Sequence, residues 1–127
     1  MSHPPSLRFS APVIKGAGRG RIIGSPTVNL ALTSVPAKLP FGIFACGASF
    51  DAHTHPAVLH YGPRPVFREG VSCEVHFLDG DIEHAPETLT VTVVKRLRDI
   101  RNFPSPEALQ KQIAIDVAEA RAILTAP

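Results

Sequence analysis

The sequence predicts a mainly β protein: a closed or nearly closed antiparallel barrel of six strands, with one α-helix at the C-terminal end. Short runs of β-branched and apolar residues recur along the chain as far as Phe103. Thirteen prolines and nine glycines supply turns between these runs. After Phe103, the spacing of apolar residues changes from a strand-like period to a helical one. We expect one domain over residues 1–127, with residues 1–6 frayed because Pro-Pro donates no ladder hydrogen bonds.

Six segments have the composition of β-strands. They cover residues 7–16, 27–32, 41–50, 56–62, 71–80 and 88–98. The second begins directly after Pro26, a residue that disfavours helical backbone before it. The third and fourth are separated by the polar sequence "DAHTH" at 51–55, which we expect to form a turn.

The C-terminal helix is expected over residues 105–125. Ser105 is suited to the N-cap position and Pro106 to the first helical position. The apolar side chains fall on one stripe, which we expect to pack against the barrel, and charged side chains lie off it. The stripe consists of Leu109, Ile113, Val117, Ala120 and Leu124, and the charged residues off it are Lys111, Glu119 and Arg121.

The composition restricts the partners of the protein. The formal net charge is only +2, tryptophan is absent and Tyr61 is the only tyrosine, whereas nucleic-acid binders usually carry a basic stripe or aromatic platforms. Cys46 and Cys73 stand alone in apolar contexts, which indicates two reduced, buried thiols. No signal peptide follows Met1, and no apolar run is long enough to cross a bilayer. We therefore expect a cytoplasmic protein, and a monomer, with no nucleic-acid or membrane partner.

Residues 16–30, "GAGRGRIIGSPTVNL", are unusually rich in glycine at their start. Glycine at this density weakens a strand, but it lets backbone N–H groups approach a bulky anion. The segment is not a Walker A motif, because no Gly-Lys-Ser/Thr follows, and no helix opens after it as in a Rossmann fingerprint. From the segment alone, a flexible turn and a phosphate-binding loop remain alternatives.

Thr27 and Asn29 follow the glycines on the second expected strand. Since they are two positions apart, their side chains face the same way. A hydroxyl and an amide oxygen are hard ligands, suited to Mg²⁺ that keeps several waters and bridges phosphates. The alternative interpretation is a solvent-facing polar pair on an edge strand.

The strand over 71–80 alternates clearly between apolar and polar residues. Cys73, Val75 and Phe77 should face one side, and Glu74 and His76 the other. Glu74 is a candidate general base, although a carboxylate in this pattern also fits the solvated face of a half-buried strand.

Three histidines, His53, His55 and His60, lie close together in the sequence "HTHPAVLH". Histidines two apart on a strand are able to hold Zn²⁺. No cysteine or carboxylate completes a set with a recognised spacing, which favours a polar hairpin turn over a metal site.

Taken in order, these segments resemble the riboflavin kinase family, including the kinase module of bifunctional bacterial FAD synthetases. The family pattern has a G-x-G-R-G-R-x-x-G loop followed by P-T-x-N-L, and this chain has "GAGRGRIIGSPTVNL". "FGIFACGASF" resembles the next family strand, "LHYGPRPVF" an I-G-x-x-P-T-F loop, and "CEVHFLD" an E-V-H-L-L-D strand. "RLRDIRNFPSPEALQKQIAIDVAEAR" is similar to the closing segment and helix. The resemblance covers roughly residues 8 to 124.

The resemblance implies a Greek-key barrel and a kinase that transfers phosphate from ATP with Mg²⁺ to the ribityl 5′-hydroxyl of riboflavin, giving FMN and ADP. Glu74 is the implied catalytic base, Thr27 and Asn29 the implied metal-binding residues, and Arg98, Asp99 and Phe103 the implied flavin end of the site. The implied nucleotide-binding residues are Gly16, Gly18, Arg19, Gly20, Arg21, Gly24, Pro26, Thr27 and Asn29.

The chain departs from the family pattern in three places. Ser25 replaces a bulky residue before Pro-Thr, Val66 replaces a threonine, and residues 79–88 lack the usual Tyr-Gly turn. None of these changes removes an implied catalytic residue. We expect no nucleotidyltransferase domain in a chain of 127 residues, so the reaction should stop at FMN. The alternative function is a non-catalytic barrel module that binds flavin or RNA.

Overall fold

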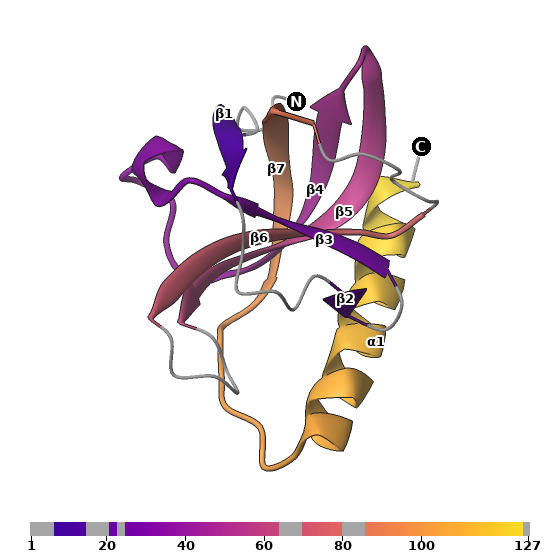
Figure 1. Cartoon of the computed structure of the whole chain (residues 1–127). Coiled ribbons are helices and arrows are strands. Elements are labelled where there is room, and N and C mark those ends of the chain that lie inside the picture. The colour runs from indigo at the N-terminus through magenta and orange to yellow at the C-terminus, as the bar shows by residue number, and fades with distance from the viewer. Residues whose placement is uncertain (1–6, 15–20, 23–24, 64–69, 80–85, 126–127) are drawn as a thin grey trace, which may run out of the picture.

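The structure is a computed structural model that describes residues 7–14, 21–22, 25–63, 70–79 and 86–125 (Figure 1). Strands make up most of the described chain, and one α-helix follows them. The elements in order are β1 (Leu7–Ile14), β2 (Arg21–Ile22), β3 (Ser25–Leu30), the 3₁₀ helix η1 (Leu32–Ser34), β4 (Gly42–Phe50), β5 (His53–Pro63), β6 (Val71–Phe77), β7 (Thr88–Arg98) and α1 (Pro106–Leu124).

Six long strands close into an antiparallel barrel, with the two-residue β2 added beside β3. The strand order is β1-β7-β4-β5-β6-β3-β2, and a further pairing of β1 with β3 closes the ring. Consecutive strands β4, β5 and β6 are neighbours, whereas β7 returns across the barrel to lie beside β4. This return gives the Greek-key order, so the structure confirms the expected barrel.

The barrel core is built from the inward-facing residues of all six long strands. Alternation along each strand sends every second side chain inward. The largest of the fully buried side chains are Phe77, Leu30, Leu59, Leu89, Val75, Val91, Cys46 and Cys73. Both cysteines are free, as predicted, and burial raises the pKa of the Cys73 thiol to about 12. The two thiols therefore act as apolar core groups.

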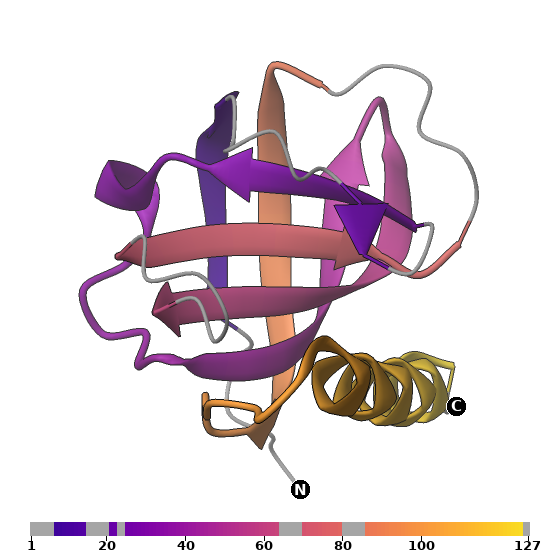
Figure 2. The same cartoon turned by 60° about the horizontal axis from the view of Figure 1, so that its bottom comes forward.

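The helix α1 lies outside the barrel, against β4 and β5 (Figure 2). A second apolar cluster joins the outward-facing side chains of these strands to the helix. Its buried members are Ile43, Ala45, Val58, Leu78 and Ala120, and Val117 and Leu124 pack against it. The helix begins as predicted, because Ser105 Oγ accepts a hydrogen bond of 3.1 Å from the Ala108 N–H and Pro106 takes the first position.

Two sequence-based expectations about strand ends are wrong. The turn after β4 contains only Asp51 and Ala52, both with positive φ, so His53 and His55 belong to β5 rather than to a polar turn. The strand expected over 27–32 is β3, which starts earlier, at Ser25, and ends at Leu30. The 3₁₀ helix η1 turns the chain immediately afterwards.

Candidate functional site

The polar residues singled out on β3 and β6 lie next to each other on the outer face of the barrel. The two strands are antiparallel, and Val28 and Val75, which are register partners, both point into the core. Their neighbours in sequence must therefore point outward. Asn29 lies directly opposite Glu74 in this register. Residues far apart in the sequence are in this way brought to adjacent positions, which a single strand pattern does not reveal.

Thr27 lies opposite a histidine on the same face. Its register partner is His76, and Thr27 Oγ1 and His76 Nδ1 are 3.4 Å apart. His76 is only 8% exposed, and burial lowers its pKa from 6.5. The lowered pKa favours a neutral imidazole, which has one donor and one acceptor nitrogen.

The carboxylate of Glu74 is held by a neighbour on its own strand. Ser72 Oγ donates a hydrogen bond of 2.8 Å to Glu74 Oε2. Because the two residues are two positions apart on β6, both side chains lie on the outer face. Ser72 therefore restrains the rotamer of the carboxylate beside Asn29.

One row of register partners connects this pair to the end of β7. The row crosses five strands through Asn29, Glu74, His60, Ile43 and Arg98. Directly opposed residues in a sheet face the same side, and neighbouring strands are about 4.8 Å apart. The residues expected at the phosphate end and at the flavin end thus lie on the same outer face of the sheet, which α1 covers at Ile43.

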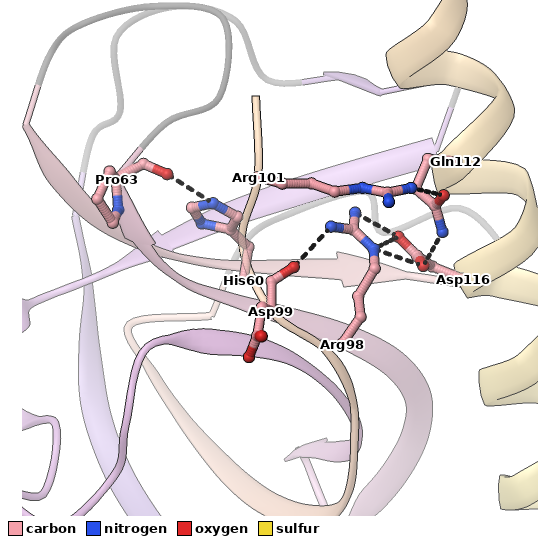
Figure 3. A network of polar contacts seen from close by, with 7 residues as sticks. All are labelled: His60, Pro63, Arg98, Asp99, Arg101, Gln112 and Asp116. Carbon is pink, nitrogen blue, oxygen red and sulfur yellow. Dashed lines mark hydrogen bonds and ion pairs between the residues drawn. The ribbon is translucent and has the colours of Figure 1, made fainter. Parts of the chain in front are cut away.

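Arg98 occupies the end of this row and is bound to the helix. Its Nε donates to Asp116 Oδ1 and Oδ2 at 2.9 and 3.1 Å, and its Nη2 donates to Oδ2 at 2.8 Å. The side chains of Arg98 and Asp116 are 17% and 4% exposed. Gln112 Nε2 adds a bond of 3.0 Å to Oδ1 (Figure 3). This bidentate pair, with its amide partner, fixes the middle of α1 relative to the end of β7.

The segment after β7 places the ring of Phe103 close to two guanidinium groups. Arg98 and Arg101 lie over the ring of Phe103, with Cζ 5.6 and 5.3 Å from the ring centroid. Asp99 points elsewhere, since its side chain is 87% exposed and pairs with Arg96. Among the three residues expected at the flavin end, Arg98 is therefore in contact with Phe103, and its Nη1 donates to the Asp99 carbonyl oxygen at 3.0 Å, while the Asp99 side chain pairs with Arg96.

Several expected nucleotide-binding residues lie outside the described residues. These are Gly16, Gly18, Arg19, Gly20 and Gly24. For Arg21 and Pro26 the structure gives the backbone, in which the two residues are register partners in the β2–β3 pair. This pair continues the strand that carries Thr27 and Asn29.

The residue types on the face of β3 fit a Mg²⁺ ion that carries a nucleotide. Thr27 and Asn29 are half-buried and share the outer face. Mg²⁺ binds oxygen ligands and usually keeps several waters, so one or two protein ligands besides phosphates are sufficient. Within the described ranges, no three His, Cys, Asp or Glu residues gather in a way that would hold a metal ion. A zinc-type cluster is thus not built from that part of the chain.

The three histidines of β5 do not lie on one face of the strand. His53 and His55 lie on the face opposite to that of His60, because they differ from it by an odd number of positions. His55 stacks on Phe50 with ring centroids 4.8 Å apart. His60 instead lies beside Glu74 in the register, and its Nε2 donates to the Pro63 carbonyl oxygen at 3.2 Å (Figure 3).

The sequence did not predict four features of the candidate site. These are His60 beside Glu74, Ser72 bonded to Glu74, His76 in contact with Thr27, and Asp116 paired with Arg98. The alternation of β6 already places Ser72 and His76 on the face of Glu74. No sequence pattern signals the burial of Asp116, because a charged residue in an amphipathic helix is usually exposed.

Comparison with known proteins gives a consistent result. A family model described as "Flavokinase: Riboflavin kinase" matches residues 4–124. Human riboflavin kinase is 33% identical over 122 residues, which cover 91% of this chain and 79% of that protein. The bifunctional riboflavin kinase/FMN adenylyltransferase of Pseudomonas fluorescens is 36% identical over 119 residues, or 92% of this chain. This chain spans only 38% of that protein and 35% of the bifunctional enzyme of Bacillus subtilis.

Solved structures agree in fold. A riboflavin kinase from Trypanosoma brucei superposes with a TM-score of 0.63 at 17% identity, covering 99% of this chain and 84% of that one. A Streptococcus pneumoniae structure described as a macrolide-efflux protein gives 0.76 at 26% identity, covering 96% of this chain and 40% of that one. In the part of the chain that the structure describes, no helix is both long enough and apolar enough to cross a membrane. The family match over nearly the whole length, with the human enzyme as a relative, shows that the chain belongs to the riboflavin kinase family.

Proposed function

We propose that this protein transfers the terminal phosphoryl group of ATP to the ribityl 5′-hydroxyl of riboflavin, giving FMN and ADP. Family membership supports the reaction. The observation that carries the proposal is the β3–β6 register, which sets Asn29 directly opposite Glu74 with Thr27 on the same face. Phosphoryl transfer asks a protein mainly for positioning and charge neutralisation. Groups that hold phosphate and a group that orients the acceptor must therefore be adjacent, and the side chains proposed for these roles are neighbours in the register.

In this proposal Thr27 and Asn29 hold a Mg²⁺ ion that is bound to the nucleotide. When bound, the ion neutralises charge on the β- and γ-phosphates of ATP. The chain contributes a hydroxyl and an amide oxygen on one outward-facing strand. Residues Gly16, Gly18, Arg19, Gly20, Arg21 and Gly24 are proposed to cover the phosphates with backbone N–H and guanidinium groups.

Glu74 is the proposed catalytic base. Its carboxylate accepts a hydrogen bond from the 5′-hydroxyl and aligns that oxygen with the γ-phosphorus. As the new O–P bond forms and the bond to the β-phosphate oxygen breaks, the hydroxyl proton moves to the carboxylate and ADP leaves. The hydrogen bond from Ser72 supports this role because it restricts the carboxylate to one orientation.

The proposed flavin end is the segment after β7, with Arg98, Asp99 and Phe103. Arg98 is engaged with Asp116, so its contribution is to hold Phe103 and the helix in place rather than to contact the flavin by a free guanidinium group. The row through His60 and Ile43 joins this end to Glu74.

The domain organisation, the oligomeric state and the cellular location of the protein are also proposals. We propose that the chain acts as one kinase domain and as a monomer, since the proposed catalytic and metal-binding residues come from a single barrel. We place the reaction in the cytoplasm, a compartment in which free thiols such as Cys46 and Cys73 stay reduced.

The test is to incubate the protein with riboflavin, ATP and Mg²⁺ and to separate the flavins by chromatography. Wild type should form FMN. Glu74→Gln should lower kcat by about 10²-fold or more with little change in flavin affinity, and Thr27→Ala should abolish the Mg²⁺-dependent reaction. Glu119→Gln, on the exposed face of α1, is the matched control and should keep full activity.

Two outcomes would contradict the proposal. Flavin binding without FMN formation, over a range of nucleotides and metals, would identify a non-catalytic flavin-binding barrel. Absence of both turnover and flavin binding would leave an RNA-binding or other interaction module as the function of this fold.

A further inference from the structure

We propose that Gln112 is a positioning residue for flavin binding: from α1 it holds Arg101 against the ring of Phe103, and it thereby fixes the segment between β7 and α1 before the flavin arrives. The inference rests on the proposed kinase function, in which this segment is the flavin end of the site. Gln112 takes no part in phosphoryl transfer, so we expect its effect on the affinity for riboflavin.

Residues 99–104, which join β7 to α1, are held mainly by side chains. Among the described residues, the backbone hydrogen bonds outside the helices and strands include none from this segment. Ile100 packs against the apolar cluster beneath α1. Phe103 is half-buried, and the guanidinium groups of Arg98 and Arg101 lie over its ring. The position of this ring therefore depends on where the two arginine side chains are anchored.

Both guanidinium groups are anchored on α1, one helical turn apart. Arg98 is bound to the buried carboxylate of Asp116. Arg101 Nη2 donates a hydrogen bond of 2.5 Å to Gln112 Oε1 (Figure 3). Gln112 and Asp116 are four positions apart, so they lie on the same side of the helix. The helix thus holds the two guanidinium groups that contact the ring of Phe103.

The amide of Gln112 has one orientation that satisfies both of its neighbours. A carboxylate only accepts hydrogen bonds and a guanidinium group only donates them. Gln112 Nε2 donates to Asp116 Oδ1 at 3.0 Å, which leaves the amide oxygen to accept from Arg101. Gln112 therefore connects the buried ion pair to Arg101, an exposed side chain that has many rotamers when it has no partner.

This connection affects binding through the order that already exists in the free protein. Ordering one long side chain when a ligand binds weakens the affinity by about twofold to tenfold at 25 °C. In wild type the Gln112 amide orders Arg101 beforehand. Without the amide, riboflavin has to order Arg101 on the ring of Phe103, so we expect a loss of about fivefold. Arg98 lies four strands from Asn29 in the register row, so nucleotide affinity should not change.

The first measurement is the titration of riboflavin alone, by calorimetry, into wild type, Gln112→Met and Gln110→Met. Methionine has the length of glutamine without its donor and acceptor, and Gln110 is the matched control because it is exposed on the same helix. Gln112→Met should bind riboflavin about fivefold more weakly, and Gln110→Met should stay within about twofold of wild type. The affinity for Mg²⁺–ADP should stay within about twofold in both variants. Unchanged riboflavin affinity in Gln112→Met, or an equal loss for riboflavin and Mg²⁺–ADP, would overturn the inference.

The second measurement tests whether Gln112 acts through Arg101. Arg101→Met is an exposed substitution that removes both the hydrogen bond to Gln112 and the contact with Phe103. If Gln112 acts only by holding Arg101, the double variant Gln112→Met/Arg101→Met should bind riboflavin as Arg101→Met does, within about twofold. Losses that multiply in the double variant would show independent effects, and the positioning role would be wrong.

The two proposals fail in different ways. Equal riboflavin affinity in wild type and Gln112→Met would overturn the role of Gln112, even if wild type makes FMN. Wild type that binds riboflavin, loses affinity in Gln112→Met and yet forms no FMN would refute the kinase function and leave the positioning role intact. Wild type that binds no riboflavin would overturn both.

Discussion

Replacing Asp116 with leucine should destabilise the protein strongly, because it leaves the Arg98 guanidinium at the helix–barrel junction without its counter-ion. Leucine also removes the acceptor of Gln112. The change is at the only place in the described chain where a buried carboxylate is paired with a largely buried guanidinium. It therefore tests whether this pair, rather than apolar contact alone, holds α1 in position.

The magnitude follows from the burial of the two partners. Three donor–acceptor contacts of 2.8 to 3.1 Å join Arg98 to a carboxylate whose side chain is 4% exposed. Removing one member of a buried pair costs about 3–5 kcal/mol, since the other charge stays buried and unpaired. Arg98 is 17% exposed, so water replaces part of the lost interaction, and we expect the lower end, about 3 kcal/mol. For a domain of this size that corresponds to a fall in Tm of roughly 10 °C.

Urea unfolding followed by circular dichroism measures this difference in free energy. Asp79→Leu is the control, because it removes an ion pair between the helix and the barrel whose side chains, Arg121 and Asp79, are 46% and 58% exposed. The control should lose less than about 1 kcal/mol. The double variant Arg98→Leu/Asp116→Leu should lose less than the sum of the two single variants. A loss for Asp116→Leu no larger than that of the control would refute the reasoning.

Three further predictions concern stability. Gly62→Ala should lower the free energy of unfolding in urea by about 2 kcal/mol or more, because φ is +144° and a Cβ would lie 2.3 Å from Ile100 Cδ1. Gly70→Ala is the control and should lose less, because φ is +80° but the space around it is open. Since the pKa of His76 is lowered from 6.5 in the folded state, the unfolded state binds the proton first. Unfolding free energy should therefore be greatest above pH 6.5 and fall as the pH drops below it, and this dependence should weaken in His76→Asn. Ser105→Ala should lose about 1 kcal/mol and lower the helical circular dichroism signal, since the Ala108 N–H loses its cap.

Local patterns predicted most of the elements. The strand over 88–98 has the predicted bounds, and Ser105 caps the helix as expected, because both depend on residues close in sequence. The alternation around Glu74 likewise gave the correct outward face. The turn at Asp51 and Ala52 was misjudged because it uses positive φ at an alanine, a conformation that its sequence does not signal.

The site was predictable as a set of residues but not as a geometry. Sequence alone placed Thr27 and Asn29 on one face and Glu74 on another strand, yet it did not give the register that opposes Asn29 to Glu74. That register depends on the closure of the whole barrel. The burial of Asp116 depends on the same long-range packing, which brings the end of β7 against α1.

The short pairing between β1 and β3 has a consequence for the entropy of ligand binding. Among the described residues, two register pairs join these strands, Val13 with Leu30 and Ile14 with Asn29. These pairs place Ile14, which precedes the glycine-rich segment, beside Asn29, which follows its glycines. Folding itself therefore joins the two ends of this stretch of chain. For a loop of this length, the entropy lost on bringing its ends together is of the order of a few kcal/mol. In the proposed kinase function, this entropy is lost on folding and not on nucleotide binding, so the β1–β3 pairing would add to nucleotide affinity without contacting the ligand.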